Sequence, residues 1–337
     1  MSETVFGAWR RGRANTICDV SGIEVGQAHD DKARTGVTVV APKTRAVAAA
    51  DIRGGGPGTR ETDLLEPSRL VREIDAVVLA GGSVYGLEAA SAVTNWLGAR
   101  GRGYRLMSLD GVPVSPIVPG AILYDLANGG DKNWGEAPPY AALGRAACEA
   151  LGARVALGRA GAGYGARAGA LKGGVGSASA VSCTGLAIGA IMAVNAFGSA
   201  VMPGTDVFWA WPFEIDGEFG GRRPPRDWPG AGLAYPLDTK AGARPGANTT
   251  IGVLAVNAAL DGGQAKRVAV MAQDGIARAL RPAHAPVDGD AIFVIATGEI
   301  ALPEPAALAL TELGSIAADC VARAVARGVY EAERQGG

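Results

Sequence analysis

Five short apolar runs, rich in valine, isoleucine and alanine, constrain the fold of this chain more than any other feature. Each is bounded by glycine, proline, asparagine or aspartate. They span residues 37–40, 76–80, 187–194, 251–256 and 292–296. Short apolar runs between turn residues are typical of strands buried on both faces. We therefore expect buried strands that are covered by other layers of structure.

Segments with helical spacing lie between these runs. They span residues 84–97, 141–151, 265–280 and 305–333, and Pro305 is well placed to open the last of them. The mixture predicts an α/β or α+β fold in which helices cover sheets. Residues 213–247 differ, because they combine glycine, proline and charge with little apolar content. We expect a long exposed loop or linker there, of the kind that is often functional.

The charge balance argues against a nucleic-acid or membrane partner. The 337 residues contain 32 Lys and Arg against 33 Asp and Glu, which leaves a net charge of -1. A basic patch for nucleic acid or for an anionic lipid surface is not indicated. The first 20 residues carry basic side chains without an apolar run, so they predict neither a secretory signal nor a membrane span. We expect a cytoplasmic enzyme with a small-molecule substrate.

Cysteine and histidine are scarce. The four cysteines lie far apart without a CxxC pair, which favours reduced thiols over disulfides or a zinc site. The only histidines are His29 and His284. A Ser-His-Asp triad or a multi-histidine metal site therefore has few possible members. We expect no metal and no organic cofactor, and a catalytic base other than histidine.

The junction Asn248-Thr249-Thr250 is the most informative place in the sequence. It joins the polar segment 213–247 to an apolar strand. Cleavage before Thr249 would give this residue a free α-amine with a pKa of about 8, next to the hydroxyl that it must deprotonate. The tripeptide is also a glycosylation sequon, a role that requires secretion, or simply a loop that ends in a strand.

Three further features invite a functional and a structural interpretation. Asp288-Gly289-Asp290 precedes the strand at 292–296, and two residues of that spacing on a strand would face one site, although such a tripeptide is often an ordinary turn. Asn195 ends an apolar strand, where its amide could serve an oxyanion or only a turn. The glycine-rich run 158–166 fits a loose dinucleotide fingerprint, but without a suitable strand and helix around it a close-packing or substrate-facing loop is the better interpretation.

Motifs along nearly the whole chain resemble the DmpA-like family of L-aminopeptidase/D-esterases, which includes β-aminopeptidases and the nylon-oligomer hydrolase. The resemblance is carried by NTICDVSGIEVGQA (15–28), TGVTV (35–39), DIRGGGPGTRETDLL (51–65), LAGGSVYGLEAA (79–90), GRAGAGYGA (158–166), VNAFG (194–198), GANTTIGVLAVNA (246–258) and DGD (288–290). Their order and joint presence make the resemblance specific.

The resemblance implies a self-cleaving precursor with a four-layer α/β/β/α sandwich. Residues 1–337 would form a single domain of this type, which cleavage divides into a large chain, 1–248, and a small chain, 249–337. These heterodimers would assemble further into a homo-oligomer, a tetramer in the family. The family nucleophile is Ser or Thr, and the nylon-oligomer hydrolase has Thr preceded by Asn, as in this sequence.

The resemblance also assigns site residues. Thr249 would be the nucleophile, and Asp288 and Asp290 would hydrogen-bond its amine and hydroxyl. Asn195 would stabilise the oxyanion or position the new N-terminus. By itself Tyr124 would be a core or interface aromatic, but it matches a family tyrosine that could bind the carbonyl oxygen or the substrate. Lys172 lies near the position of a site lysine, although the glycine-rich spacing around it differs.

The sequence thus predicts a self-processing N-terminal-threonine aminopeptidase or amidase. Its substrates would be small amine-bearing amides or esters, such as amino acid amides, short peptides, β-peptides or ω-amino acid oligomers. Two alternatives stay open. One is an acyltransferase of the ornithine acetyltransferase type, and the other is an uncleaved ligand-binding protein that uses the glycine loops.

Overall fold

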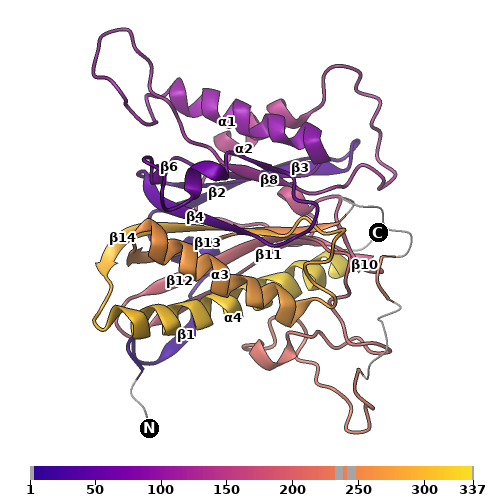
Figure 1. Ribbon diagram of the computed structural model, residues 1–337. Coiled ribbons are helices and arrows are strands. Elements are labelled where there is room, and N and C mark those ends of the chain that lie inside the picture. The colour runs from indigo at the N-terminus through magenta and orange to yellow at the C-terminus, as the bar shows by residue number, and fades with distance from the viewer. Residues whose placement is uncertain (1–3, 232–237, 241–247, 336–337) are drawn as a thin grey trace.

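Two β-sheets lie face to face in the computed structural model, which describes residues 4–231, 238–240 and 248–335. Helices α1 (Glu88–Gly98) and α2 (Tyr140–Glu149) cover the outer face of one sheet, and α3 (Gly262–Ala279) and α4 (Ala306–Arg334) cover the other (Figure 1). The order of layers is α/β/β/α, and the predicted fold class is confirmed. None of the helices in the described part of the chain combines the length and hydropathy needed to cross a membrane.

The larger sheet carries the strands that position the site. Its order is β1 (Trp9–Arg11), β11 (Gly174–Ser182), β12 (Ala187–Asn195), β13 (Thr249–Ala259), β14 (Ala291–Ala301), β4 (Ala46–Ile52) and β6 (Glu73–Ile74). The second sheet has the order β2 (Ile23–Asp30), β3 (Thr35–Pro42), β7 (Val77–Ala80), β8 (Gly120–Ile122) and β5 (Thr59–Arg60). A separate hairpin joins β9 (Arg167–Ala168) to β10 (Leu171–Lys172).

Alternate residues of the central strands enter different apolar layers. Along β13, Ile251 and Val253 pack between the two sheets, whereas Leu254 and Val256 pack under α3 and α4. A third layer lies between the second sheet and helices α1 and α2. Because both faces of these strands are covered, their sequences are continuously apolar rather than alternating. All five predicted strands are present, and they are longer than or close to the apolar runs.

The first predicted helix begins later than its apolar spacing suggests. Residues 83–87 form a 3-10 turn, and α1 starts only at Glu88. Gly82 and Ser83 have φ values of 82° and 52°, so the chain leaves β7 in a left-handed turn before it can become helical. The remaining predicted helices match α2, α3 and α4 to within three residues at either end.

A buried ion pair ties the loop after Phe213 to the core. Arg323 of α4 is 2% exposed, and its Nε and Nη2 donate to the two carboxylate oxygens of Glu218 at 2.5 and 3.0 Å. The Arg323 Nη2 also donates to Asn15 Oδ1 at 2.8 Å. The predicted loop is therefore anchored in its first part, and residues 232–237 and 241–247 of that prediction lie outside the described residues.

Candidate active site

The pairing of β12 with β13 brings the two central residues of the site together. The register is antiparallel, and it places Asn195 directly opposite Thr249. Side chains alternate along a strand, and Ala193 and Ile251 both face the space between the sheets. Asn195 and Thr249, each two residues away, therefore point to that same side, at the end of the apolar layer.

The amide of Asn195 is held by groups from several segments. Its Nδ2 donates to the backbone carbonyl of Tyr124 at 3.0 Å, and its Oδ1 accepts from the backbone N–H of Arg167 at 3.0 Å. Tyr124 follows β8 of the second sheet. The structure thus brings Tyr124 to the site through its backbone carbonyl, while its side chain is half-buried.

The peptide bond between Asn248 and Thr249 is buried, and its carbonyl has two donors. Asn248 and Thr249 are 0% and 2% exposed. The hydroxyl of Thr249 donates to the Asn248 carbonyl oxygen, and the backbone N–H of Gly289 donates to the same oxygen at 2.9 Å. The Thr249 hydroxyl and a backbone N–H donor therefore both lie at the carbonyl oxygen of Asn248.

Asp288 and Asp290 both lie at this bond, although not through the geometry that the sequence suggested. The strand begins only at Ala291, so the two carboxylates are placed by a loop. Asp290 accepts from the backbone N–H of Thr250 at 2.7 Å. Asp288 accepts from the backbone N–H of Phe197 at 3.2 Å, and residue 288 pairs with Asn248 through an isolated parallel bridge.

Burial, and after it the charge of Asp290, raises the pKa of Asp288 to about 6, even though backbone hydrogen bonds from Ala285 and Phe197 act to lower it. Two carboxylates close together in a buried site resist joint ionisation. The pair is therefore suited to hold a cation such as a protonated amine.

The glycine cluster at 54–56 fits against the loop that carries these carboxylates. The N–H of Gly54 donates to the Asp290 carbonyl at 3.2 Å, and that of Gly56 donates to the Asp288 carbonyl at 2.8 Å. A Cβ on Gly54 would collide with the backbone of both aspartates. Glycine is needed here because the two backbones approach so closely.

Comparisons with known proteins identify the family of the chain. The sequence profile of peptidase family S58 matches residues 15–337. The chain belongs to peptidase family S58. An uncharacterized aminopeptidase from Mycobacterium tuberculosis is 48% identical over 337 residues, which cover 95% of this S58 chain and 94% of that protein. The 6-aminohexanoate-oligomer endohydrolase of Kocuria sp. is 31% identical over 300 residues, 87% of this chain and 78% of its own length.

Solved structures share the fold of this S58 chain. The L-aminopeptidase D-Ala-esterase/amidase from Ochrobactrum anthropi, described as a variant of the Ntn hydrolase fold, aligns with a TM-score of 0.70 and 22% identity over 95% of this chain and 86% of its own. A Burkholderia β-aminopeptidase aligns with a TM-score of 0.67 and 22% identity over 96% and 88%. The predicted resemblance is confirmed, and the S58 chain is a hydrolase of amide bonds.

Sequence reasoning missed two side chains at the candidate site. His284 Nδ1 lies 2.9 Å from Asp290 Oδ2, so one of the two histidines does adjoin the carboxylates. Lys240 Nζ donates to the side-chain and main-chain oxygens of Asn195 at 3.2 and 3.3 Å. The position of His284, four residues before Asp288, could have indicated that it lies near the carboxylates. Lys240 gave none, because it lies in the polar segment without a motif.

Lys172 occupies a different place from Lys240. It lies on β10 and is half-buried, and its backbone N–H donates to Glu333 near the end of α4 at 2.5 Å. Among the lysines within the described ranges, it is Lys240 whose ammonium group donates to Asn195. The catalytic role of Lys172 stays a prediction from the resemblance.

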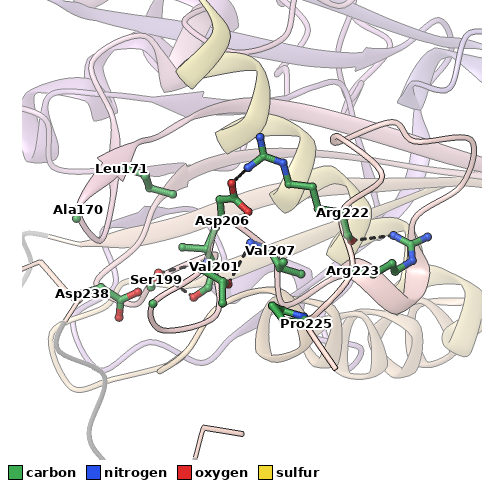
Figure 2. A pocket seen from close by; sticks show the side chains of 12 residues that line it. Ala170, Leu171, Ser199, Val201, Asp206, Val207, Arg222, Arg223, Pro225 and Asp238 are labelled. Carbon is green, nitrogen blue, oxygen red and sulfur yellow. Dashed lines mark hydrogen bonds and ion pairs between the residues drawn. The ribbon is translucent and has the colours of Figure 1, made fainter. Parts of the chain in front are cut away.

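A cavity of about 760 Å³ opens beside the segment that follows Asn195 (Figure 2). Its apolar wall includes Leu171, Val201 and Val207, and Asp206 and Arg222 form an ion pair on it. Asp238 also lines it, and one of its carboxylate oxygens is buried without a hydrogen-bond partner among the described residues. The cavity thus combines apolar surface with a few charged groups, as small-molecule sites do.

The glycine-rich run 158–166 serves close packing. A Cβ on Gly163 would collide with the backbone of Gly174 in β11, and one on Gly161 with Thr38 Oγ1. The described residues contain no cluster of three or more histidine, cysteine or acidic side chains that could hold a metal ion.

Proposed function

We propose that this S58 hydrolase cuts its own chain between Asn248 and Thr249 and then uses Thr249 as an N-terminal nucleophile. The observation that carries the proposal is the convergence of the Thr249 hydroxyl and the Gly289 N–H on the Asn248 carbonyl oxygen. The proposal divides the single domain into a large chain, 1–248, and a small chain, 249–337, whose heterodimers assemble into a homo-oligomer.

In the first step, Thr249 Oγ1 attacks the Asn248 carbonyl carbon. The Gly289 N–H stabilises the charge that develops on the carbonyl oxygen, since it already donates to that atom. The C–N bond then breaks, the nitrogen of Thr249 takes up the proton that the hydroxyl has lost, and an ester joins Asn248 to Oγ1. Water hydrolyses this ester, which frees the Asn248 carboxylate and the Thr249 hydroxyl.

In the mature enzyme, the α-amine of Thr249 accepts the hydroxyl proton. This amine has an ordinary pKa of about 8, which suits a base at neutral pH. Asp288 and Asp290 hold and orient it, because the Asp290 carboxylate already accepts from the Thr250 N–H and the backbone of Asp288 lies beside Asn248. Asn195 stabilises the oxyanion of the acyl-enzyme reaction, with Tyr124 beside it, and water releases the acyl group. These steps use only groups of the chain and water.

The substrates we propose are small amides or esters with a free amine. The acidic pair favours a cationic amine near the nucleophile. The relatives named above include aminopeptidases and a 6-aminohexanoate-oligomer endohydrolase. Amino acid amides, short peptides, β-peptides and ω-amino acid oligomers form the screening set.

A pair of isosteric variants tests the proposal. Thr249→Val removes the nucleophilic hydroxyl and is expected to give an uncut, inactive chain. Thr250→Val is the matched control, because the Thr250 hydroxyl is buried and has no hydrogen-bond partner in the part of the chain that the structure describes, and this variant is expected to cleave normally. Cleavage of the 248–249 bond in Thr249→Val would refute self-processing by this residue. An assay of acetyl transfer to glutamate separates the hydrolase from the acyltransferase alternative.

A further inference from the structure

Lys240 reaches the site from the polar segment that precedes the scissile bond. Its backbone N–H donates to the Phe197 carbonyl at 3.0 Å, and the Phe197 N–H donates to Asp288 at 3.2 Å. Its Nζ lies on Asn195, at 3.2 Å from Oδ1 and 3.3 Å from the main-chain oxygen. Lys240 is thus linked through its backbone to the segment that contacts Asp288 and through its side chain to Asn195.

Lys240 is one of three groups whose contacts set the direction in which the Asn195 amide points. The oxygen and nitrogen of an asparagine amide have the same shape, so hydrogen-bond partners determine the orientation. A charged Lys240 Nζ has hydrogens to donate and no lone pair with which to accept. It therefore faces Oδ1 of Asn195, as the backbone N–H of Arg167 does. The Asn195 Nδ2 is directed to the opposite side, where it donates to the Tyr124 carbonyl.

We propose that Lys240 is a positioning residue, which fixes the Asn195 amide for both self-cleavage and substrate hydrolysis. The inference rests on the proposed function, since Lys240 is assigned to orient Asn195, the residue proposed to stabilise the oxyanion. Lys240 acts through Asn195. It belongs to the large chain and lies eight residues before Asn248, the last residue of that chain.

Burial and charge support this assignment. Burial, and after it the charge of Arg167, lowers the pKa of Lys240 to about 7, even though the charge of Asp288 acts to raise it. A desolvated ammonium group is costly unless its N–H donors find acceptors, and two acceptors on Asn195 serve that of Lys240. Charged donors also make stronger hydrogen bonds than neutral ones. Positioning by Lys240 should consequently be firmest below pH 7 and weaken above it.

Two substitutions of Lys240 and one of an exposed lysine test the proposal. Lys240→Met removes the donor, and Lys240→Arg keeps donors and a charge at every pH used. Lys43→Met is the matched control, because the Lys43 side chain is 65% exposed and its ion-pair partner, Glu24, lies in the second sheet. The rate of self-cleavage and the kcat and KM of the processed enzyme on an amino acid p-nitroanilide are measured from pH 6 to pH 9, with Tm as a check on folding.

The expected result is a loss of about 10- to 100-fold in both the cleavage rate and kcat for Lys240→Met, with a smaller change in KM, because the lost interaction orients a transition-state donor. Lys240→Arg should restore most of the rate, and its rate relative to wild type should rise from pH 6 to pH 9. Wild-type rates in a folded Lys240→Met variant overturn the proposal, as do equal losses in Met and Arg variants of unchanged Tm. Thr249→Val in the same series separates the outcomes: if it is cut, the proposed function fails, whatever Lys240 does.

Discussion

A single methyl group on Gly289 should block the nucleophile while leaving the fold in place. Gly289 does not have a left-handed backbone, so alanine is sterically allowed by φ. Its new Cβ would lie 2.8 Å from Thr249 Oγ1 and 2.9 Å from the Gly56 carbonyl oxygen. Both separations are shorter than ordinary contacts, so either the hydroxyl or the loop has to move.

The magnitude follows from the small size of this shift. Overpacking of this kind costs about 1–3 kcal/mol, and moving Oγ1 off its rotamer adds about 0.5–1.5 kcal/mol. A displacement of a reacting atom by up to 1 Å can cost about 100-fold in rate. Gly289→Ala is therefore expected to fold with a Tm lower by several degrees and to self-cleave about 100 times more slowly.

The assay follows precursor and products on denaturing gels over time, with a thermal melt of the same samples. Gly152→Ala is the matched control, because its Cβ would meet nothing within 4 Å. Cleavage of Gly289→Ala at the wild-type rate would show that residue 289 does not lie against the Thr249 hydroxyl. Equal slowing of Gly152→Ala would show that the effect is not local.

Three further substitutions test other parts of the structure. Asp288→Asn removes a carboxyl group whose pKa in the folded protein is raised from 3.8 to about 6, chiefly by burial. Between these two pH values the folded wild type holds a proton that the unfolded chain releases. The Tm of wild type minus that of Asp288→Asn should therefore fall as the pH rises from 4 to 6. Arg323→Met leaves the buried Glu218 with Arg327, whose Nε lies 3.7 Å from Oε2, as its ion-pair partner, and the lost charged hydrogen bonds should lower the free energy of unfolding by about 1.5–3 kcal/mol in urea titrations; an unchanged midpoint would contradict a contribution of Arg323 to stability. Lys172→Met should change the cleavage rate less than twofold if the contact of its backbone with Glu333 is its main role; a loss as large as that of Lys240→Met would instead support the site role predicted from the resemblance.

The strands and their layers could be predicted because burial on both faces leaves a local signature. The continuous apolar run at 251–256 is the direct result of covering Ile251 on one side and Leu254 on the other. The start of α1 could not be predicted as easily. The turn at Gly82 and Ser83 depends on backbone angles that the apolar spacing does not record.

The site was predictable where residues belong to motifs and unpredictable where only tertiary contacts define it. Asn195, Thr249 and the aspartates meet because β12, β13 and β14 are neighbours. The pairing of Asn195 with Thr249 is a matter of register, which the sequence alone does not specify. Lys240 reaches Asn195 across 45 positions of the chain, and no periodicity or composition marks such a contact.

The most direct test of the central claim is the intact mass of the purified wild-type protein, together with the N-terminal sequence of each species. The account predicts two species of about 25 and about 9 kDa from the 34.0 kDa chain, the smaller beginning at Thr249. A single 34.0 kDa species that stays uncut for days at neutral pH, yet hydrolyses amides, would contradict the claim that Thr249 acts as an N-terminal nucleophile.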